Sequence, residues 1–374
     1  MSGTVLNVFD QDAFTSVSLT AAVERNPYPP SGLGKLHLFE EDFLYTQDFM
    51  VEQEKGQLMV LPMQERGEPP TQLPSKADKR EARYFRCPMI AHEAKVTALE
   101  VMGVRETGTI ARMRTMQQLL GKRLNGPSGL QANLEYTMER HRLAAVQGML
   151  LDAVPANAAP GTAPAVKYNW FEQFGIAQPA PINFPLSNLA GSAVPTGKFR
   201  TACNETVRKM ARASQGAFSD RTKVIGLCSD EFWDALIINN DVTSTYFNWL
   251  AAAQLREGSA FRGMADANPM LAETYTTPLY FGGIYWINYR GSDDLTSIAL
   301  KPGTCALFPQ GAAGVFSVAY APHDSEEWVN KRANKKYIVP LIDRERQRWR
   351  KFELYSYPLH ICTRPEVLFS GVAT

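Results

Sequence analysis

The stretch LEYTMERHRLAAVQGMLLDA, residues 134–153, decides how the rest of the chain is interpreted, because it lies in a long helical pattern. Gly126 and Pro127 precede that pattern, and Ser128 is placed to cap a helix there. The apolar residues at or near helical spacing are Leu130, Leu134, Met138, Ala145 and Met149. We predict one helix over about 128–152, about 37 Å long at 1.5 Å per residue, which suits the backbone of an elongated subunit.

The charged residues of this stretch lie off the apolar stripe, so we expect them to face solvent. They are Glu135, Glu139, Arg140 and Arg142. His141 follows the same pattern and is expected on the helix surface. A further helix is predicted just upstream, over about 105–124.

Residues 49–98 have the pattern of two strands around a polar tip. The tip, QERGEPPTQLPSKADKREAR at 64–83, is too long for a hairpin loop in a compact domain. Its basic end consists of Lys76, Lys79, Arg80, Arg83 and Arg86. The loop is therefore either solvated and disordered, or it reaches a partner.

Residues 1–48 show little periodicity, and AAVERNPYPPSGLGKL favours extended and turn backbone because of its prolines and glycines. We interpret this segment as an arm that becomes ordered only against something else. After the long helix comes a Pro/Ala/Gly linker at 154–166. A long hairpin is then predicted at about 165–187 and a helix at 199–216.

From residue 222 the pattern becomes that of an α+β domain. TKVIGLC predicts a buried strand ending at Cys228, with Ser229 or Asp230 capping the helix that follows. Gly282–Gly283 indicates a tight hairpin and Pro302–Gly303 a type II turn between two more strands. GVFSVAY adds another strand.

Near the end, DRERQRWRK places an arginine at every second position: Arg344, Arg346, Arg348 and Arg350. In an extended chain these four side chains would share one face and repel one another. They indicate either a solvated edge strand or contact with an acidic neighbour or a polyanion. Residues 352–362 are apolar on both alternating faces, which predicts a strand covered on both sides.

Composition excludes several classes of protein. The chain has 39 basic and 38 acidic residues, which argues against a dedicated DNA-binding domain. No apolar run is long enough to span a membrane, and the first residues lack the pattern of a secretion signal. The 5 cysteines lie far apart and fit neither a disulfide framework nor a zinc site. No motif indicates catalytic, cofactor-binding or metal-binding residues, so we expect neither an enzyme nor a cofactor.

Several segments, in order, resemble the lambda-type major capsid proteins of tailed phages, the capsid protein E family. The resemblance runs nearly end to end, and its specificity lies in the order and spacing of the segments. They are LTAAVERNPYPPSGLGKLHLFEED at 19–42, LEVMGVRETGT at 99–109, the opening stretch at 134–153, NWFEQFGIAQPAPINFPLSN at 169–188, LCSDEFWDALIINNDV at 227–242, FGGIYWINYRG at 281–291, ALFPQGAAGVFSVAYAPHDSEEWVNK at 306–331 and PLHICTRPEVLF at 358–369.

The resemblance implies the Hong Kong 97-type fold, an α+β capsid fold with a long spine helix at about 128–152. Its implied parts are an N-terminal arm at 1–48, an extended E-loop hairpin at 49–92, a peripheral domain at 93–221, an axial domain at 222–340 and C-terminal strands at 341–374 that return to the peripheral domain. We expect the final strands to pair with the 165–187 hairpin and pack under the spine helix.

The implied function is a shell-forming major capsid protein that encloses double-stranded DNA. The implied partners are other copies of the chain in hexamers and pentamers, scaffolding, portal and decoration proteins, and packaged DNA by weak non-specific contact, with no membrane. The implied location is the virion, after assembly in the host bacterial cytoplasm. The alternatives are an encapsulin-like shell, another virion protein such as a tail tube, and a soluble cytosolic α+β enzyme.

Overall fold

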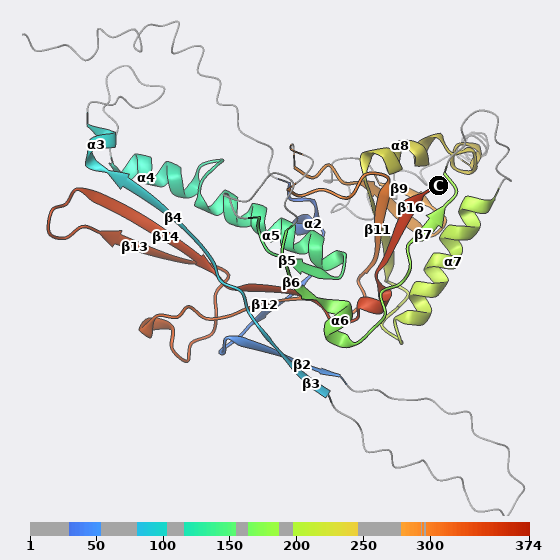
Figure 1. Cartoon of the computed structure of the whole chain (residues 1–374), viewed down its shortest axis with the longest axis horizontal. Helices are drawn as coiled ribbons and strands as arrows, with labels where there is room; N and C mark the ends of the chain where they lie inside the picture. The colour runs from blue at the N-terminus through green and yellow to red at the C-terminus, as the bar shows by residue number, and fades with distance from the viewer. Residues whose placement is uncertain are drawn as a thin grey trace, which may run out of the picture.

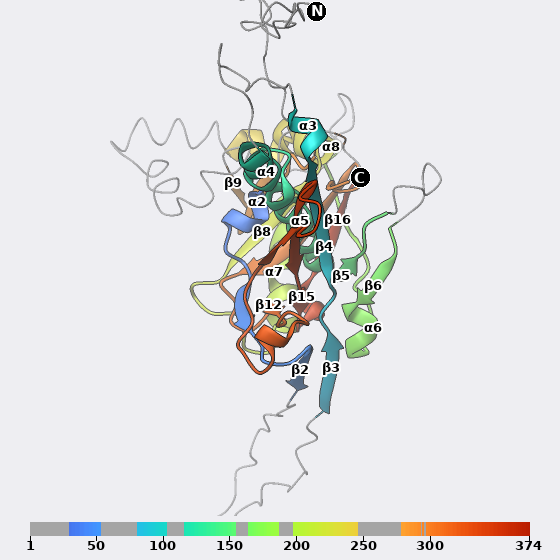
Figure 2. The ribbon, with the colours of Figure 1, turned by 90° about the vertical axis from the view of Figure 1, so that its left-hand side faces the viewer.

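The computed structural model describes residues 30–53, 81–102, 116–154, 164–186, 197–245 and 278–374 except 293, 295 and 296. The molecule is elongated: one half is built on a long helix over two small sheets, and the other on a six-stranded sheet (Figure 1). A two-stranded hairpin projects from the middle of the body, which is best seen in Figure 2.

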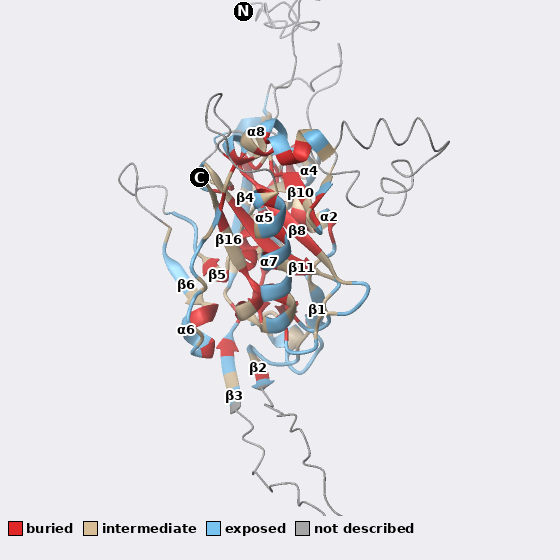
Figure 3. Ribbon diagram, turned by 90° about the vertical axis from the view of Figure 1, so that its right-hand side faces the viewer, coloured by how far each residue is buried: buried red, intermediate tan, exposed pale blue. Residues whose placement is uncertain are grey.

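The six-stranded sheet has the order β7-β16-β11-β8-β10-β9. Its strands are β7 (Ile182–Phe184), β8 (Lys223–Cys228), β9 (Leu279–Phe281), β10 (Ile284–Asn288), β11 (Thr304–Gln310) and β16 (Phe369–Ala373). Helices α7 (Lys198–Ala213) and α8 (Asp230–Ile238) pack against it. Phe199 of α7 stacks on Phe281, and Phe232 of α8 stacks on Trp286. Figure 3 shows the buried strands behind α7.

Local sequence explains the centre of this sheet. All of β8 except its first residue is buried, and the Ser229 hydroxyl accepts a hydrogen bond from the Phe232 N–H, so it caps α8 as predicted. The β9–β10 hairpin is also confirmed, because Gly282 and Gly283 have φ of 63° and 81°, which a type I′ turn requires. The Pro302–Gly303 turn is present, with Gly303 at φ 69°, but no strand precedes it among residues 297–301.

The other half is organised around α5 (Leu130–Val146). Its sheets have the orders β13-β14-β4 and β1-β12-β15. Their strands are β1 (Glu40–Phe43), β4 (Ile90–Thr97), β12 (Phe316–Tyr320), β13 (Tyr337–Ile342), β14 (Trp349–Ser356) and β15 (Pro358–Cys362). Short helices complete this half: α2 (Gly32–Lys35), α3 (Ala98–Val101), α4 (Met116–Asn125) and η3 (Glu326–Trp328). A further short helix, η4 (Pro365–Val367), contacts α7 of the other half. Leu130, Leu134 and Met138 of α5 join one apolar cluster with Val318 and Leu354.

The long helix is shorter than predicted. It is capped by Gly129 without a side-chain hydrogen bond, so the expected Ser128 cap is wrong. It ends at Val146 because Gly148 turns the chain at φ 80° directly against Phe171, where an added Cβ would lie 2.3 Å from Cε2. Strand β5 (Met149–Leu151) follows immediately.

The predicted 165–187 hairpin is wrong. Strand β6 (Val166–Asn169) pairs with β5, helix α6 (Trp170–Phe174) comes next, and β7 pairs with β16 in the six-stranded sheet. The sequence shows the strand-forming residues of this segment but not their partners, which come from distant parts of the chain.

The C-terminal segment divides its strands among the three larger sheets. Strand β14 pairs with β4 and β13, and β15 pairs with β12 beneath α5. Strand β16 pairs with β7 on one side and with β11 on the other. Strands β14 and β15 thus lie near the long helix, whereas the last strand lies inside the six-stranded sheet and pairs there with β7 of the 165–187 segment.

Candidate assembly site

One buried carboxylate holds the segment before β1 on α5. The Leu33 N–H donates to Oε1 of Glu139 at 2.7 Å, and the Gly34 N–H donates to Oε2 at 3.0 Å. The Tyr289 hydroxyl donates to Oε1 at 3.2 Å, and Nη1 of Arg142 donates to Oε2 at 3.3 Å. We call these five residues the arm clasp. It joins the arm, the long helix and the end of β10.

The local sequence of the arm allows this close approach. Leu33 and Leu36 are each only 1% exposed, so they anchor α2 by apolar burial. A Cβ at Gly34 would lie 2.9 Å from Nη1 of Arg142, and a Cβ at Gly32 would lie 3.4 Å from the Tyr289 ring. A side chain at Gly34 would therefore displace the Arg142 guanidinium, whereas one at Gly32 would reach the Tyr289 ring only at ordinary contact distance.

The negative charge of the Glu139 carboxylate is matched by the groups of the arm clasp that surround it. Burial raises the pKa of Glu139, while the Leu33 N–H and the Arg142 guanidinium oppose that rise. Every group facing the carboxylate is a donor, and an ionised carboxylate only accepts. Glu139 was expected to face solvent, and that expectation is wrong.

His141 was also expected on the helix surface, and that prediction is wrong as well. It is 6% exposed and faces His360 of β15, with ring centroids 5.8 Å apart. Burial lowers the pKa of His141 to about 4 and that of His360 well below its usual value. The Nδ1 atoms of both rings have no hydrogen-bond partner among the described residues. Two neutral imidazoles thus lie in the core next to the clasp.

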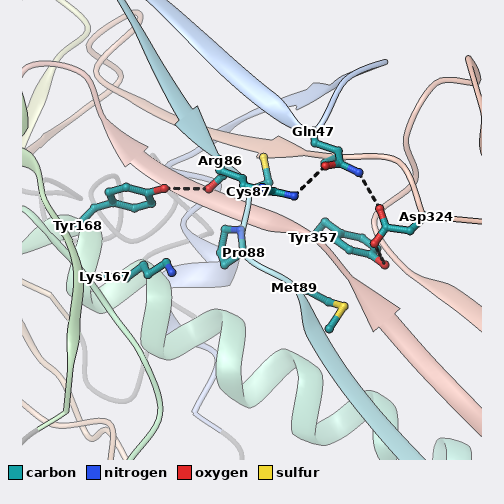
Figure 4. Close-up of a pocket in the computed structure, with 10 residues that line it drawn as sticks. Gln47, Arg86, Cys87, Pro88, Met89, Lys167, Tyr168, Asp324 and Tyr357 are labelled. Carbon is teal, nitrogen blue, oxygen red and sulfur yellow. Dashed lines mark hydrogen bonds between the residues drawn. The ribbon is translucent and has the colours of Figure 1, made fainter.

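The second part of the site is where the hairpin of β2 (Asp48–Gln53) and β3 (Glu81–Arg86) leaves the body (Figure 4). Nε2 of Gln47 donates to Oδ1 of Asp324 at 2.8 Å, and Nη2 of Arg86 donates to Oε1 of Gln47 at 3.1 Å. The hydroxyl of Tyr357 donates to Oδ2 of Asp324 at 3.4 Å, and that of Tyr168 donates to the Arg86 carbonyl at 3.1 Å. We call these five residues the hairpin root.

The hairpin root borders a surface cavity of about 400 Å³. Its other lining residues include Cys87, Pro88, Met89 and Lys167, as Figure 4 shows. Burial raises the pKa of Cys87 to about 12, so this thiol stays protonated at neutral pH and is a weak nucleophile. We therefore interpret the cavity as a junction between structural elements.

The two faces of the hairpin differ. Val51 and Phe85 are buried, and the Phe85 ring lies edge-on to Trp170 at 5.3 Å between centroids. On the opposite face the directly paired Met50 and Tyr84 are 45% and 69% exposed. A hairpin anchored on one face that carries large apolar side chains on the other is suited to contact with another molecule.

The basic residues predicted at the hairpin fall into two groups. Lys76, Lys79 and Arg80 lie outside the described residues. The Arg83 guanidinium lies 5.6 Å from the centroid of the Phe174 ring, and Arg86 belongs to the hairpin root. The structure therefore places these two arginines at the base of the hairpin, and contact with a neighbour stays a prediction.

The alternating arginines do not form the predicted extended strand. Arg344, Arg346 and Arg348 lie in the exposed turn between β13 and β14, and only Arg350 is in a strand. Asp343 causes this, because its carboxylate accepts the N–H groups of Arg346 and Arg348 at 3.1 and 3.3 Å. These backbone hydrogen bonds, led by that from Arg346, lower the pKa of Asp343. The turn gathers three exposed arginines without placing them on one strand face.

Two kinds of site are not found in the described part of the chain. None of its helices combines the length and apolar character needed to cross a bilayer. It also holds no cluster of three or more His, Cys, Asp and Glu side chains arranged to bind a metal ion. The candidate site thus consists of the two joints, the arm clasp and the hairpin root.

Comparison with known proteins agrees with this architecture. The chain is 22% identical over 380 residues to the major capsid protein of Salmonella phage Felix O1, covering 96% of each. It is 24% identical over 271 residues to the major capsid protein of Pseudomonas phage KPP10, covering 71% of this chain and 70% of that one.

Two solved structures share the fold. The capsid structure of cyanophage P-SCSP1u matches with a TM-score of 0.52 at 11% identity, over 95% of this chain and 91% of that chain. The mature capsid of bacteriophage PhiM1 matches with a TM-score of 0.50 at 8% identity, over 95% and 89%. The Hong Kong 97-type fold implied by the sequence is thereby confirmed. The family model of phage major capsid protein E matches residues 15–373, and the chain therefore belongs to that family.

Proposed function

We propose that this major capsid protein of a tailed phage assembles into hexamers and pentamers that close an icosahedral shell around packaged double-stranded DNA. The observation that carries the proposal is the projecting β2–β3 hairpin, which is anchored by Phe85 and exposes Met50 and Tyr84. Such an outer face is suited to burial against another subunit, and closed shells repeat such contacts around rotation axes. The family match favours this function over an encapsulin-like shell, a tail tube or an enzyme.

The division into domains is also a proposal. The half around α5 would be the peripheral domain, and the six-stranded sheet with α7 and α8 would be the axial domain. Residues 1–48 would be the arm and 49–92 the E-loop hairpin. The pairing of β16 with β11 supports an axial domain that includes the last strand and is therefore larger than residues 222–340.

The family places the protein in the virion. Assembly in the host bacterial cytoplasm, with scaffolding, portal and decoration proteins, belongs to the proposal. So does weak non-specific contact with DNA, which a chain of net charge +1 would make only through local basic surfaces. The exposed arginine turn between β13 and β14 is one such surface, and an acidic neighbour is its other candidate contact.

Electron microscopy and sedimentation of the full-length protein, expressed in bacteria with and without the phage's assembly proteins, test the proposal. Closed shells, or rings of five and six copies, are the expected result. Stable monomers under every condition, or tubes of uniform width, would contradict it.

A further inference from the structure

Helix α8 presents an unusual outer surface. Asp230, Glu231 and Asp234 are exposed along it, and Ile237 and Ile238 at its end are 46% and 67% exposed. We call these five residues the α8 face. Two adjacent exposed isoleucines on a helix indicate a surface that contacts apolar atoms of another molecule.

Intramolecular contacts explain only part of this face. Asp230 accepts a hydrogen bond from Asn288 at 3.0 Å, and Glu231 accepts one from the Gly303 N–H at 3.2 Å. Both also lie in the first turn, where the helix dipole favours acids. Asp234 lies beyond that turn, and no hydrogen bond or ion pair of its side chain is found within the described residues. The face fits a partner that offers cations beside apolar side chains.

Helix α7 offers such a surface. Its buried residues Phe199, Cys203, Thr206 and Met210 define its inner side. Arg208, Lys209 and Arg212 are exposed on the outer side, with the half-buried Ala211 between them. We call these four residues the α7 face. Figure 3 shows the exposed outer side of α7 at the end of the molecule that also carries α8.

The three cations of the α7 face outnumber the acids of the helix. Arg208 and Arg212 are four residues apart on a helix, where like charges repel. Neither is in an ion pair within the described chain, and the nearest acid on the helix is Glu205. An external anion is therefore the natural counterpart of the α7 face.

We propose that the α7 face of one copy docks on the α8 face of the next copy around a capsomer axis. This inference rests on the proposed shell function. In a ring, each copy meets its neighbour through two different surfaces, so one chain must carry both halves of a complementary pair. The basic α7 face and the acidic α8 face are such a pair, and the exposed isoleucines would be buried between them.

Packaged DNA is the competing occupant of the α7 face. It explains the arginines but not the exposed Ile237 and Ile238, because a phosphate backbone offers no apolar surface. A second copy of the chain accounts for both faces at once.

Charge exchange tests the contact. Full-length Asp234→Arg and the double variant Arg208→Glu/Arg212→Glu should each lower the yield of shells or capsomers by about tenfold or more, because like charges would then meet across the contact. Combining the three substitutions should restore assembly, because the charges are exchanged and remain complementary. The matched controls Asp234→Glu and Arg208→Lys/Arg212→Lys preserve charge and should assemble like the wild type. Equal melting temperatures of unassembled subunits would show that each variant folds.

A second experiment tests whether the α7 face and the α8 face of neighbouring copies lie close together. The five native cysteines are buried, so exposed thiols introduced by Asp234→Cys and Arg212→Cys react selectively. A mixture of the two variants, treated with a short thiol crosslinker after assembly, should give a crosslinked dimer that either variant alone does not give.

Several outcomes would overturn the inference. Normal assembly of the double variant would do so, as would failure of the combined variant to recover although its subunits fold. The absence of the mixed crosslink in assembled shells would also do so. Normal shells of the double variant that retain less DNA would assign the α7 face to DNA instead. Failure of the wild-type protein to assemble under any condition would contradict the proposed function. The proposed contact between α7 and α8 would then also be rejected.

Discussion

At the scale of single residues, Glu139 is the most consequential side chain described. In Glu139→Gln the amide NH₂ would face an N–H donor, so one of the buried Leu33 and Gly34 donors would lose its acceptor. Such a loss costs about 1–3 kcal/mol. We expect denaturant unfolding of the subunit to show a decrease in stability of that size.

The matched control is Glu205→Gln on the exposed side of α7. An exposed substitution of this kind usually changes stability by less than about 0.5 kcal/mol. Equal stabilities of the two variants would mean that the arm clasp contributes nothing to the fold.

The buried histidines make a prediction about pH. Burial holds the pKa of His141 at about 4 in the folded chain, whereas an unfolded histidine titrates near 6.5. Below pH ~6.5 the unfolded chain therefore binds protons that the folded chain excludes, so the stability from the neutral imidazoles is present above that pH and lost as pH falls. The charged groups acting on the pair are Arg140, Arg142 and Asp152.

Replacing His360 by Phe should reduce this acid sensitivity. The substitution keeps an aromatic ring beside Phe39 and removes one titrating group. Each histidine contributes a slope of up to about 1.4 kcal/mol per pH unit below its unfolded pKa. Unfolding free energies measured between pH 7 and 5 should fall less steeply in the variant. Parallel curves for variant and wild type would show that His360 binds protons equally well in the folded and the unfolded chain.

At the scale of elements, the sequence predicts those whose causes are local. Strand β8, the Ser229 cap and α8 are specified within the consecutive residues 223–238, and the β9–β10 turn by two glycines. The end of α5 depends on Gly148 meeting Phe171, which no periodicity reveals. The turn at Asp343 was not predicted, because alternating arginines resemble the pattern of a strand. The Asp343 carboxylate instead accepts backbone hydrogen bonds that stabilise a turn.

The candidate site was harder to predict than the fold. The basic residues at Arg83 and Arg86 were recognised by composition, but Gln47 and Asp324 were not, because they are 277 positions apart. Glu139 was assigned to solvent because the arm that covers it comes from about a hundred residues earlier. A sequence pattern does not show which distant residues will be the hydrogen-bond partners of a polar group.

The end of α5 yields a test with an internal control. Gly148 and Gly175 both have positive φ, 80° and 65°, but only at Gly148 would a Cβ meet a neighbour, Phe171. Gly175→Ala should cost about 1–2 kcal/mol for left-handed backbone alone. Gly148→Ala should cost distinctly more because the ring must also move. Thermal unfolding of both variants measures the difference, and equal melting temperatures would mean that the ring adapts freely.

At the scale of the whole molecule, the hairpin allows the effects of a change on folding and on assembly to be measured separately. Removing the polar tip at 64–80 and closing it with a short turn leaves Val51, Phe85 and the hairpin root in place. We expect the shortened subunit to melt like the wild type but to form shells that dissociate at lower denaturant concentration. Ion pairs at the tip would be worth only ~0.2–1 kcal/mol each, multiplied over the copies in a shell. Shells of unchanged stability would show that the tip makes no contact.

The place of β16 also has a consequence for biosynthesis. Within the six-stranded sheet, β7 pairs only with β16, which is translated roughly 185 residues later. At ~5–20 residues per second the ribosome takes about 9 to 37 s to supply that partner. Throughout this interval β7 has no strand to join, and once β11 has been made one of its edges stays bare until β16 follows. These unpaired edges leave the nascent chain open to incorrect pairing. A subunit cannot enter a shell before this strand is made, so translation itself sets the earliest moment of assembly.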